Sequence, residues 1–214
     1  MTRLKSGAAR IAALSGLMIL LTADCTAAPD DANAAAATGT EAARLENLAE
    51  RPVWKRITLG RYRGVNTLRA ALDAARVRVG DLADEILGRP AFAFSTMPVE
   101  VDLVVLTPRD LGFAREASLA DIERRAGQLG FELCPAEVGP LARLAYVEQP
   151  AGEFLRIAMK PVPTWGGTSV SLTVANGGTG PILIGGEHHP DLAFAPGTRF
   201  VFMRPERVAL PDAR

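Results

Sequence analysis

The chain contains few cysteines, few histidines and no excess of charge of either sign. Its 214 residues include two Cys and two His, and 24 basic residues offset 24 acidic ones. Two cysteines exclude a disulfide-dense scaffold. A net charge of zero argues against a nucleic-acid-binding protein held by global charge, and against a polybasic membrane binder. Hydrophobic residues make up 48% of the chain, which is enough to bury a core over most of its length.

Several sequence signatures of enzymes are also missing. The chain has no Gly-rich phosphate loop, no GxSxG elbow, no HExxH helix and no CxxC pair. Its one glycine cluster of the right kind, Gly177-Gly178-x-Gly180, lies between expected strands instead of at the start of a helix, so it is not a dinucleotide cradle. The sequence therefore assigns no cofactor.

The N-terminus has the residue pattern of a targeting signal. Arg3, Lys5 and Arg10 precede an uncharged apolar run, IAALSGLMILL, at residues 11–21, and small residues follow. This run is too short to cross a hydrocarbon core of ~30 Å, but it suits the apolar section of a secretory signal. We predict a signal peptide over residues 1–27 and an exported protein of the periplasm or cell envelope. The alternative is an uncleaved amphipathic or buried helix.

Cys25 leaves a lipid anchor open. An apolar run that ends in small residues and Cys resembles a bacterial lipoprotein signal, although Asp24 stands where such signals have a small residue. A lipid on Cys25 would tether the mature chain only at its N-terminus. No second apolar stretch reaches the ~18 residues of a membrane span, so we expect no transmembrane helix in the mature chain.

The rest of the chain divides into three parts. Residues 28–51 are rich in Ala and poor in large apolar residues, which predicts a flexible linker. Residues 52–207 show regular hydrophobic patterning with no internal repeat and no second boundary, which predicts one globular domain. Residues 208–214 are a C-terminal tail.

The hydrophobic pattern predicts helices early in the domain and strands late. Helices are expected over residues 67–76 with Asn66 as the cap, over 81–87, and from Ser118 to Gly130. Strands are expected over 53–59, 99–106, 141–147, 154–160, 170–175, 181–184 and 199–204, with a hairpin turn at Asn176-Gly177. The predicted fold class is therefore α+β: a single domain with helices of the first half packed on a mostly antiparallel sheet built largely from the second half.

The most distinctive segment is GFELCPAEVGPLARLAY at residues 130–146. Further motifs accompany it: ITLG at 57–60, DLVVL at 102–106, LGF at 111–113 and IAMKP at 157–161. Together they resemble a family of small bacterial proteins with an ELCPAEVGP-type centre, a following Arg-Leu-x-Tyr strand and a glycine-linked final hairpin that ends in Phe-Val-Phe. The resemblance covers most of residues 52–204. It implies a shared fold and no mechanism, because the family has no established activity, substrate or cofactor.

Cys134 is the candidate nucleophile. A lone thiol with His188, or its neighbour His189, and Asp191 elsewhere in the chain supplies the minimum set of nucleophile, base and orienting carboxylate. The other interpretation is a small buried hydrophobe beside Leu133. Export favours burial, because an exposed free thiol would be oxidised outside the cytosol.

The sequence Glu-His-His-Pro-Asp at residues 187–191 raises a metal site as a further alternative. Imidazole and carboxylate suit zinc or copper. Neighbouring side chains of an extended loop point apart, however, so a closed site would need ligands such as Glu132, Glu137 or Cys134 from elsewhere. A solvated turn is the other interpretation, and we assign no metal ligands.

Three residues are candidates for ligand binding: Glu137 and Arg143 in the central motif, and Trp165 in a turn-rich loop. Trp165 would serve as an exposed anchor or, alternatively, cover the edge of the sheet. Residues 51–78 hold eight basic residues against Asp73 alone. Such a stripe could bind phosphate, an acidic glycan or an anionic membrane surface, or it could be a solvated face balanced by acids elsewhere.

The sequence as a whole predicts an exported, non-enzymatic binding or interaction module of the bacterial envelope. Its partner would be an envelope protein or a small ligand and no nucleic acid. One alternative is a cysteine-dependent hydrolase or transferase that uses Cys134 with His188 or His189. The other alternative is a metal-binding protein.

Overall fold

The computed structural model of the protein describes Leu48 and residues 50–204. The predictions for the signal peptide, for Cys25, for almost all of the linker and for the C-terminal tail lie outside these residues. Within the described part, none of the helices is long and apolar enough to cross a membrane.

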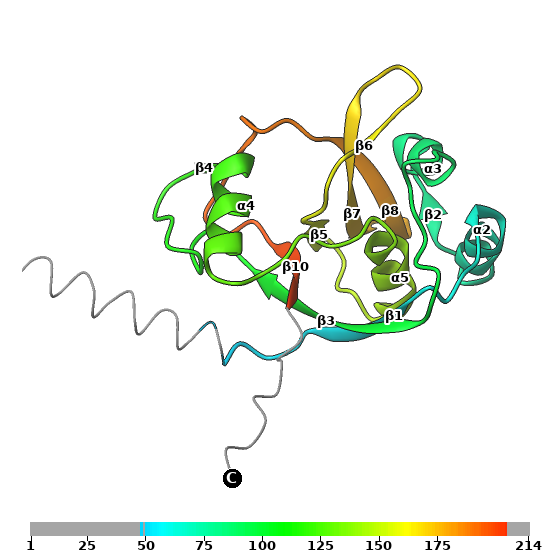
Figure 1. The fold of residues 1–214 in the computed structure, drawn as a ribbon, viewed down its shortest axis with the longest axis horizontal. Helices are drawn as coiled ribbons and strands as arrows, with labels where there is room; N and C mark the ends of the chain where they lie inside the picture. Colours follow the sequence, from blue (N-terminus) through cyan, green and yellow to red (C-terminus); the bar gives the residue numbers. More distant parts are fainter. Residues whose placement is uncertain (1–47, 49, 205–214) are drawn as a thin grey trace, which may run out of the picture. The chain divides into compact units, whose positions relative to one another are not determined.

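The described residues form short helices and a larger number of strands (Figure 1). The helices are α2 (Val65–Ala74), α3 (Asp81–Leu87), α4 (Leu119–Gln128) and α5 (Val138–Ala145). The strands are β1 (Lys55–Leu59), β2 (Arg78–Val79), β3 (Val99–Leu106), β4 (Ala117–Ser118), β5 (Phe154–Ile157), β6 (Val162–Pro163), β7 (Ser169–Gly177), β8 (Gly180–Glu187), β9 (Ala193–Phe194) and β10 (Phe200–Arg204).

One large sheet organises the fold. Its strands pair in the order β1-β3-β10-β5-β7-β8-β2, and β6 pairs with β7 beside this path. The pairs β10–β5 and β2–β8 are parallel and the others are antiparallel. Strands β4 and β9 form a separate two-stranded sheet. The prediction of one α+β domain with a mostly antiparallel sheet is confirmed.

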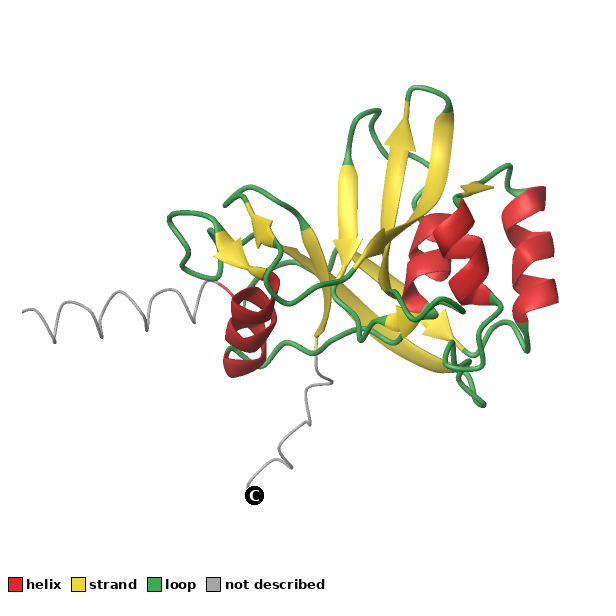
Figure 2. Cartoon of the chain, turned by 90° about the horizontal axis from the view of Figure 1, so that it is seen from above, coloured by secondary structure: helices red, strands yellow, loops and turns green. Residues whose placement is uncertain are grey.

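Helices α3 and α5 cover one face of this sheet, and α2 packs against α5; the three helices and this face enclose the larger core (Figures 1 and 2). Two glycines allow helices α5 and α3 to approach the sheet closely. A Cβ on Gly139 of α5 would lie 2.5 Å from Cδ1 of Leu172 on β7, and a Cβ on Gly185 of β8 would lie 2.6 Å from the backbone nitrogen of Ala83 on α3. Both helices therefore pack directly on the β7–β8 hairpin.

The opposite face is covered only in part. Side chains of β3 and β10, including Leu106, Phe200 and Phe202, pack with Ile122 of α4 and Phe194 of β9 in a second core. The rings of Phe194 and Phe200 meet edge to face with centroids 5.2 Å apart, a preferred aromatic geometry. Helix α4 and the small β4–β9 sheet thus close one half of this face (Figure 1).

The strand predicted over residues 141–147 is wrong, because these residues belong mainly to helix α5. A short apolar run gives little periodicity to separate the two structures, whereas Leu, Ala and Arg all have high helix propensity. Pro140 does not break the helix, because it stands in the first turn, where backbone N–H groups have no intrahelical partner.

Of the two predicted helix caps, one is confirmed and one is wrong, and the predicted hairpin forms with a different turn. Ser118 caps α4 as expected: its Oγ accepts the N–H of Asp121 at 3.1 Å. The expected cap Asn66 instead lies inside α2, which begins after Gly64. The β7–β8 hairpin is confirmed, but its two-residue turn is Gly178-Thr179, and the chain turns back at Gly180 with φ +101°.

Candidate functional site

Glu137, a predicted ligand-binding residue, holds the fold together. Only 1% of the residue is exposed. Its carboxylate accepts the backbone N–H of Gly60 after β1, and also the N–H of Ser95 at 2.7 Å. Gly60 has φ +70°, and a Cβ there would lie 2.4 Å from the carbonyl oxygen of Met97. The carboxylate therefore ties two loops to the start of α5, because each of its oxygens accepts a backbone N–H.

Arg143 is likewise buried, with 1% of the residue exposed. Its guanidinium donates to the carbonyl of Ala175 on β7 at 3.0 Å, to the side chain of Gln149 and to the carbonyl of Tyr146. Burial lowers the pKa of Arg143. These bonds attach the C-terminal end of α5 to β7, so Arg143 satisfies buried carbonyl groups instead of presenting a charge to solvent.

Cys134 lies in the larger core and is 3% exposed. Its backbone N–H donates to Ala158 at 2.7 Å, and its Sγ lies 3.5 Å from the carbonyl oxygen of Val201. Burial raises the pKa of the Cys134 thiol. A nucleophilic cysteine needs the opposite shift and an accessible sulfur. The environment of Cys134 therefore fits a packing role.

The two histidines and Asp191 follow β8 on a surface loop. The Nδ1 atom of His189 lies 3.6 Å from the carboxylate of Asp191, and both side chains are exposed. The backbone N–H of His188 donates to Ser169, and burial together with the neighbouring His189 lowers the pKa of His188.

Within the part of the chain that the structure describes, no hydrogen bond or ion pair joins either histidine to Cys134. The described residues contain no group of three or more His, Cys, Asp and Glu side chains that could hold a metal ion. The structure therefore offers no geometric support for the cysteine-dependent or the metal-binding alternative.

Trp165 differs from the other candidates because 76% of the residue is exposed. It lies in the loop between β6 and β7. Its backbone N–H donates to the Glu85 carboxylate of α3 at 2.6 Å, and the Arg89 guanidinium lies 3.7 Å from the centre of its ring. Arg89 also donates through Nε to the carbonyl of Pro163 at 2.9 Å. The indole thus does not cover the sheet edge. It projects from a loop that the side chains of Glu85 and Arg89 attach to α3 and to the segment that follows it.

The basic residues of the 51–78 stretch are compensated in part. Four ion pairs account for half of them: Arg51–Asp110, Lys55–Glu148, Arg56–Asp102 and Arg69–Asp84. The hydrogen bonds that Asp110 accepts from Thr107 and Arg51 outweigh the opposing effect of burial and lower its pKa. This distribution fits the solvated, balanced face more closely than a polyanion-binding stripe.

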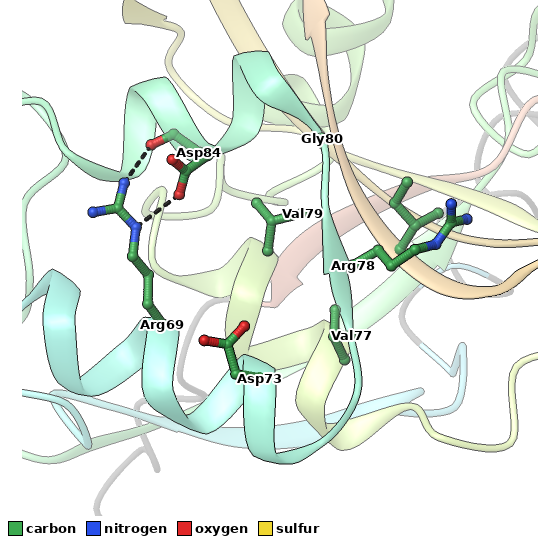
Figure 3. A pocket seen from close by; sticks show the side chains of 8 residues that line it. Arg69, Asp73, Val77, Arg78, Val79, Gly80 and Asp84 are labelled. Atoms are coloured by element: carbon green, nitrogen blue, oxygen red, sulfur yellow. Dashed lines mark hydrogen bonds and ion pairs between the residues drawn. The ribbon is translucent and has the colours of Figure 1, made fainter.

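An open groove of about 810 Å³ runs between α2, β2 and the start of α3 (Figure 3). The Arg69–Asp84 ion pair spans it, with Nε and Oδ1 2.7 Å apart. Val77 and Val79 supply apolar walls, and Asp73 a second carboxylate. Its charges are mixed: Arg69 and Arg78 of the basic 51–78 stretch line it together with Asp73 and Asp84, and Ile182 of β8 adds apolar surface.

Comparisons with known proteins add no further assignment. The chain matches no protein-family model, and neither the curated proteins nor the solved structures gave a match. The resemblance to the family with the ELCPAEVGP-type centre stays a prediction. Glu85 and Arg89, which hold the Trp165 loop, were not found from the sequence, because neither lies near Trp165 in the chain and neither belongs to a recognisable motif.

Proposed function

We propose that the chain is an exported, non-catalytic binding module of the bacterial cell envelope, and that its contact surface is centred on Trp165. The observation that carries this proposal is the exposed indole with its firm attachment. Trp and Arg are the residues most enriched at the energetic centres of protein interfaces. A loop already held in place by Glu85 and Arg89 loses little further conformational freedom when a partner binds.

The proposal that the chain is not a catalyst is supported by the structural roles of Glu137, Arg143 and Cys134 in the central motif. Glu137 and Arg143 satisfy buried backbone groups, and Cys134 is packed in the core. Export is supported by the sequence of residues 1–27, where basic residues precede an apolar run.

The exposure and stacking of Trp165 favour a protein as the partner, and for an exported chain this would be an envelope protein. Arg89 stacks on the ring, and Gly166 and Gly167 follow it without side chains that would cover it. A partner with an apolar pocket could bury most of the indole. A carboxylate beside that pocket would pair with the guanidinium edge of Arg89.

The test is site-specific photo-crosslinking in the source bacterium. A photoreactive residue replaces Gly166, next to the indole, or Gly178 in the β7–β8 turn as a matched control. A Cβ meets nothing within 4 Å at Gly178, and at Gly166 only the Thr164 hydroxyl, at 3.8 Å. We expect one discrete crosslinked product in the envelope fraction from position 166 and none from 178.

The substitution Trp165→Ala should abolish the crosslink from position 166 while the protein level stays unchanged. Equal crosslinking from both positions, or a crosslink that persists in Trp165→Ala, would refute the Trp165-centred surface. Recovery of the chain from the cytosol with Met1 and the leader still attached would refute export.

A further inference from the structure

The face of the sheet that α4 leaves uncovered carries an ordered row of side chains. Register places Phe200 of β10 next to Arg156 of β5, Arg156 next to Thr173 of β7, and Thr173 next to Ile184 of β8. Residues directly opposite each other on paired strands point to the same face. Phe200 belongs to the second core, so this row runs out of that core onto the β7–β8 hairpin.

A second row lies on the same face, two residues along each strand. It places Phe154 next to Ala175, Ala175 next to Ile182, and Ile182 next to Arg78 of β2. Phe154 is 54% exposed and Ile182 and Ile184 are partly exposed, whereas the smaller Thr173 and Ala175 between them are buried. Helices α3 and α5 pack on the other face of β7 and β8, where Leu172 and Leu183 point. In the described part of the chain, no helix of the second core reaches this half of the face.

The two rows themselves carry charge of one sign, although Arg78 and Ile182 also line the groove that contains Asp73 and Asp84. Arg156 and Arg78 are the charged side chains of the two rows, which contain no acidic residue. Strands β5 and β2 are separated by β7 and β8, so these two strands lie about 14 Å apart at ~4.8 Å per strand, and the two arginines, which stand in different rows, lie farther apart than that. Figure 3 shows the Arg78 side chain on the opposite side of β2 from Val79, which packs toward the larger core.

Arg156 is the group that points to a ligand. Its guanidinium lies 4.5 Å from the centre of the Phe194 ring, and the residue is half-buried. Burial lowers the pKa of Arg156. Its side chain makes no hydrogen bond or ion pair with any residue that the structure describes, whereas Arg199 pairs with Glu153 nearby. A partly desolvated cation without a counter-charge costs free energy, which a bound oxyanion would offset.

We propose that this open face binds an organic anion with a carboxylate head and an unbranched apolar chain. The carboxylate pairs with the edge of the Arg156 guanidinium, whose flat side rests on Phe194, and the Thr173 hydroxyl donates to it from the next strand. The apolar chain lies over Ile184 and Ile182. A single planar guanidinium matches a carboxylate in geometry and charge, and the two isoleucines supply apolar surface that a fully hydrophilic anion would leave unused.

The test is an NMR titration of the isotope-labelled chain, as isolated from cells, with three probes. Octanoate carries both the head and the chain, acetate carries the head alone, and 1-octanol carries the chain alone. We expect octanoate to shift the Nε–Hε signal of Arg156 and the amide signals of Thr173 and Ile184 to saturation. Acetate and 1-octanol should bind at least about tenfold more weakly, because each lacks half of the contacts.

Substitutions separate the site from general charge effects. Arg156→Gln should weaken octanoate binding at least about tenfold, as expected for the loss of a charged hydrogen-bond pair. Arg56→Gln removes an exposed arginine that pairs with Asp102 on β3, and should leave binding unchanged. Ile184→Asp places a carboxylate two strands from Arg156 and should weaken binding as strongly as Arg156→Gln.

Three outcomes would overturn the proposal. Octanoate that causes no saturable shift excludes the site. Acetate or 1-octanol that binds as tightly as octanoate shows simple ion pairing or simple apolar adsorption. Unchanged octanoate binding in both Arg156→Gln and Ile184→Asp places the ligand elsewhere. The proposal does not depend on Trp165, so crosslinking at position 166 and octanoate binding succeed or fail separately.

Discussion

Removing the carboxylate of Glu137 should strongly destabilise the fold. Its two oxygens accept the backbone N–H groups of Gly60 and Ser95, and the residue is buried. The substitution Glu137→Gln keeps the size of the side chain but replaces one oxygen with an NH₂ group. That group faces a backbone donor, so at least one buried N–H loses its acceptor, at a cost of about 1–3 kcal/mol. Glu137→Ala leaves both N–H groups without an acceptor, and we expect a loss of about 2–6 kcal/mol.

Urea unfolding followed by far-UV circular dichroism measures these losses. We expect the transition midpoint to fall for Glu137→Gln and further for Glu137→Ala, with an unchanged slope. Glu148→Gln is the matched control, because it breaks only the exposed pair with Lys55 and should cost less than ~1 kcal/mol. If Glu137→Gln unfolds at the same urea concentration as the unsubstituted chain, Glu137 does not hold the two loops, and its assignment to the fold must be withdrawn.

Three further predictions concern the thiol, the pH dependence and the helix contacts. Cys134 should react with a thiol reagent at pH 8 only after denaturation; rapid labelling of the folded chain would revive the cysteine-dependent alternative. The lowered pKa of Asp110 gives stability that is present above its unfolded value of 3.8 and is lost as the pH falls through the folded value. Acid titration of Asp110→Asn should therefore show a flatter stability curve below pH ~4, and an unchanged curve would contradict the pairing. Gly185→Ala should lower the melting temperature by several degrees, because its Cβ would lie 2.6 Å from a backbone nitrogen of α3, whereas Gly186→Ala meets nothing within 4 Å; equal melting would disprove that contact.

Hydrophobic alternation, capping residues and glycines predicted the elements that depend on interactions between residues close together in the chain. The alternating residues 99–106 form β3, and α3 ends before Gly88 as expected. Ser118 caps α4 because its hydroxyl reaches a backbone N–H three residues later, an interaction that needs no distant partner. Such contacts lie within a few residues along the chain, so the sequence states them directly.

At residues 141–147 the local sequence pattern did not predict the correct secondary structure. Leu141 and Ala142 are buried, and the same apolar run could have formed a buried strand. The helix fits because α5 must lie close to β7, where the missing side chain of Gly139 makes room for Leu172. That contact joins residues far apart in the chain, and it decides between two local structures of similar propensity.

Among the candidate site residues, too, some could be identified from the sequence and others only from the tertiary structure. Trp165 was named from the sequence because a large aromatic residue beside two glycines stands out in a turn. The roles of Glu137 and Arg143 were not foreseen, because a charged residue in a distinctive motif can bind a ligand or satisfy buried backbone groups, and only the packing of α5 shows the second. Arg156 lies in an ordinary strand, and only strand pairing brings it beside Thr173 and only the packing of β9 on the sheet brings it to Phe194.

The sequence by itself determined the α+β class, most element positions and the prediction of a leader, because periodicity, capping and apolar runs act over short stretches of chain. The tertiary structure alone decided which polar groups are buried and which remain available. That choice depends on which strands pair and which helices cover them, and the free energy of a charge is set by the neighbours that folding brings to it.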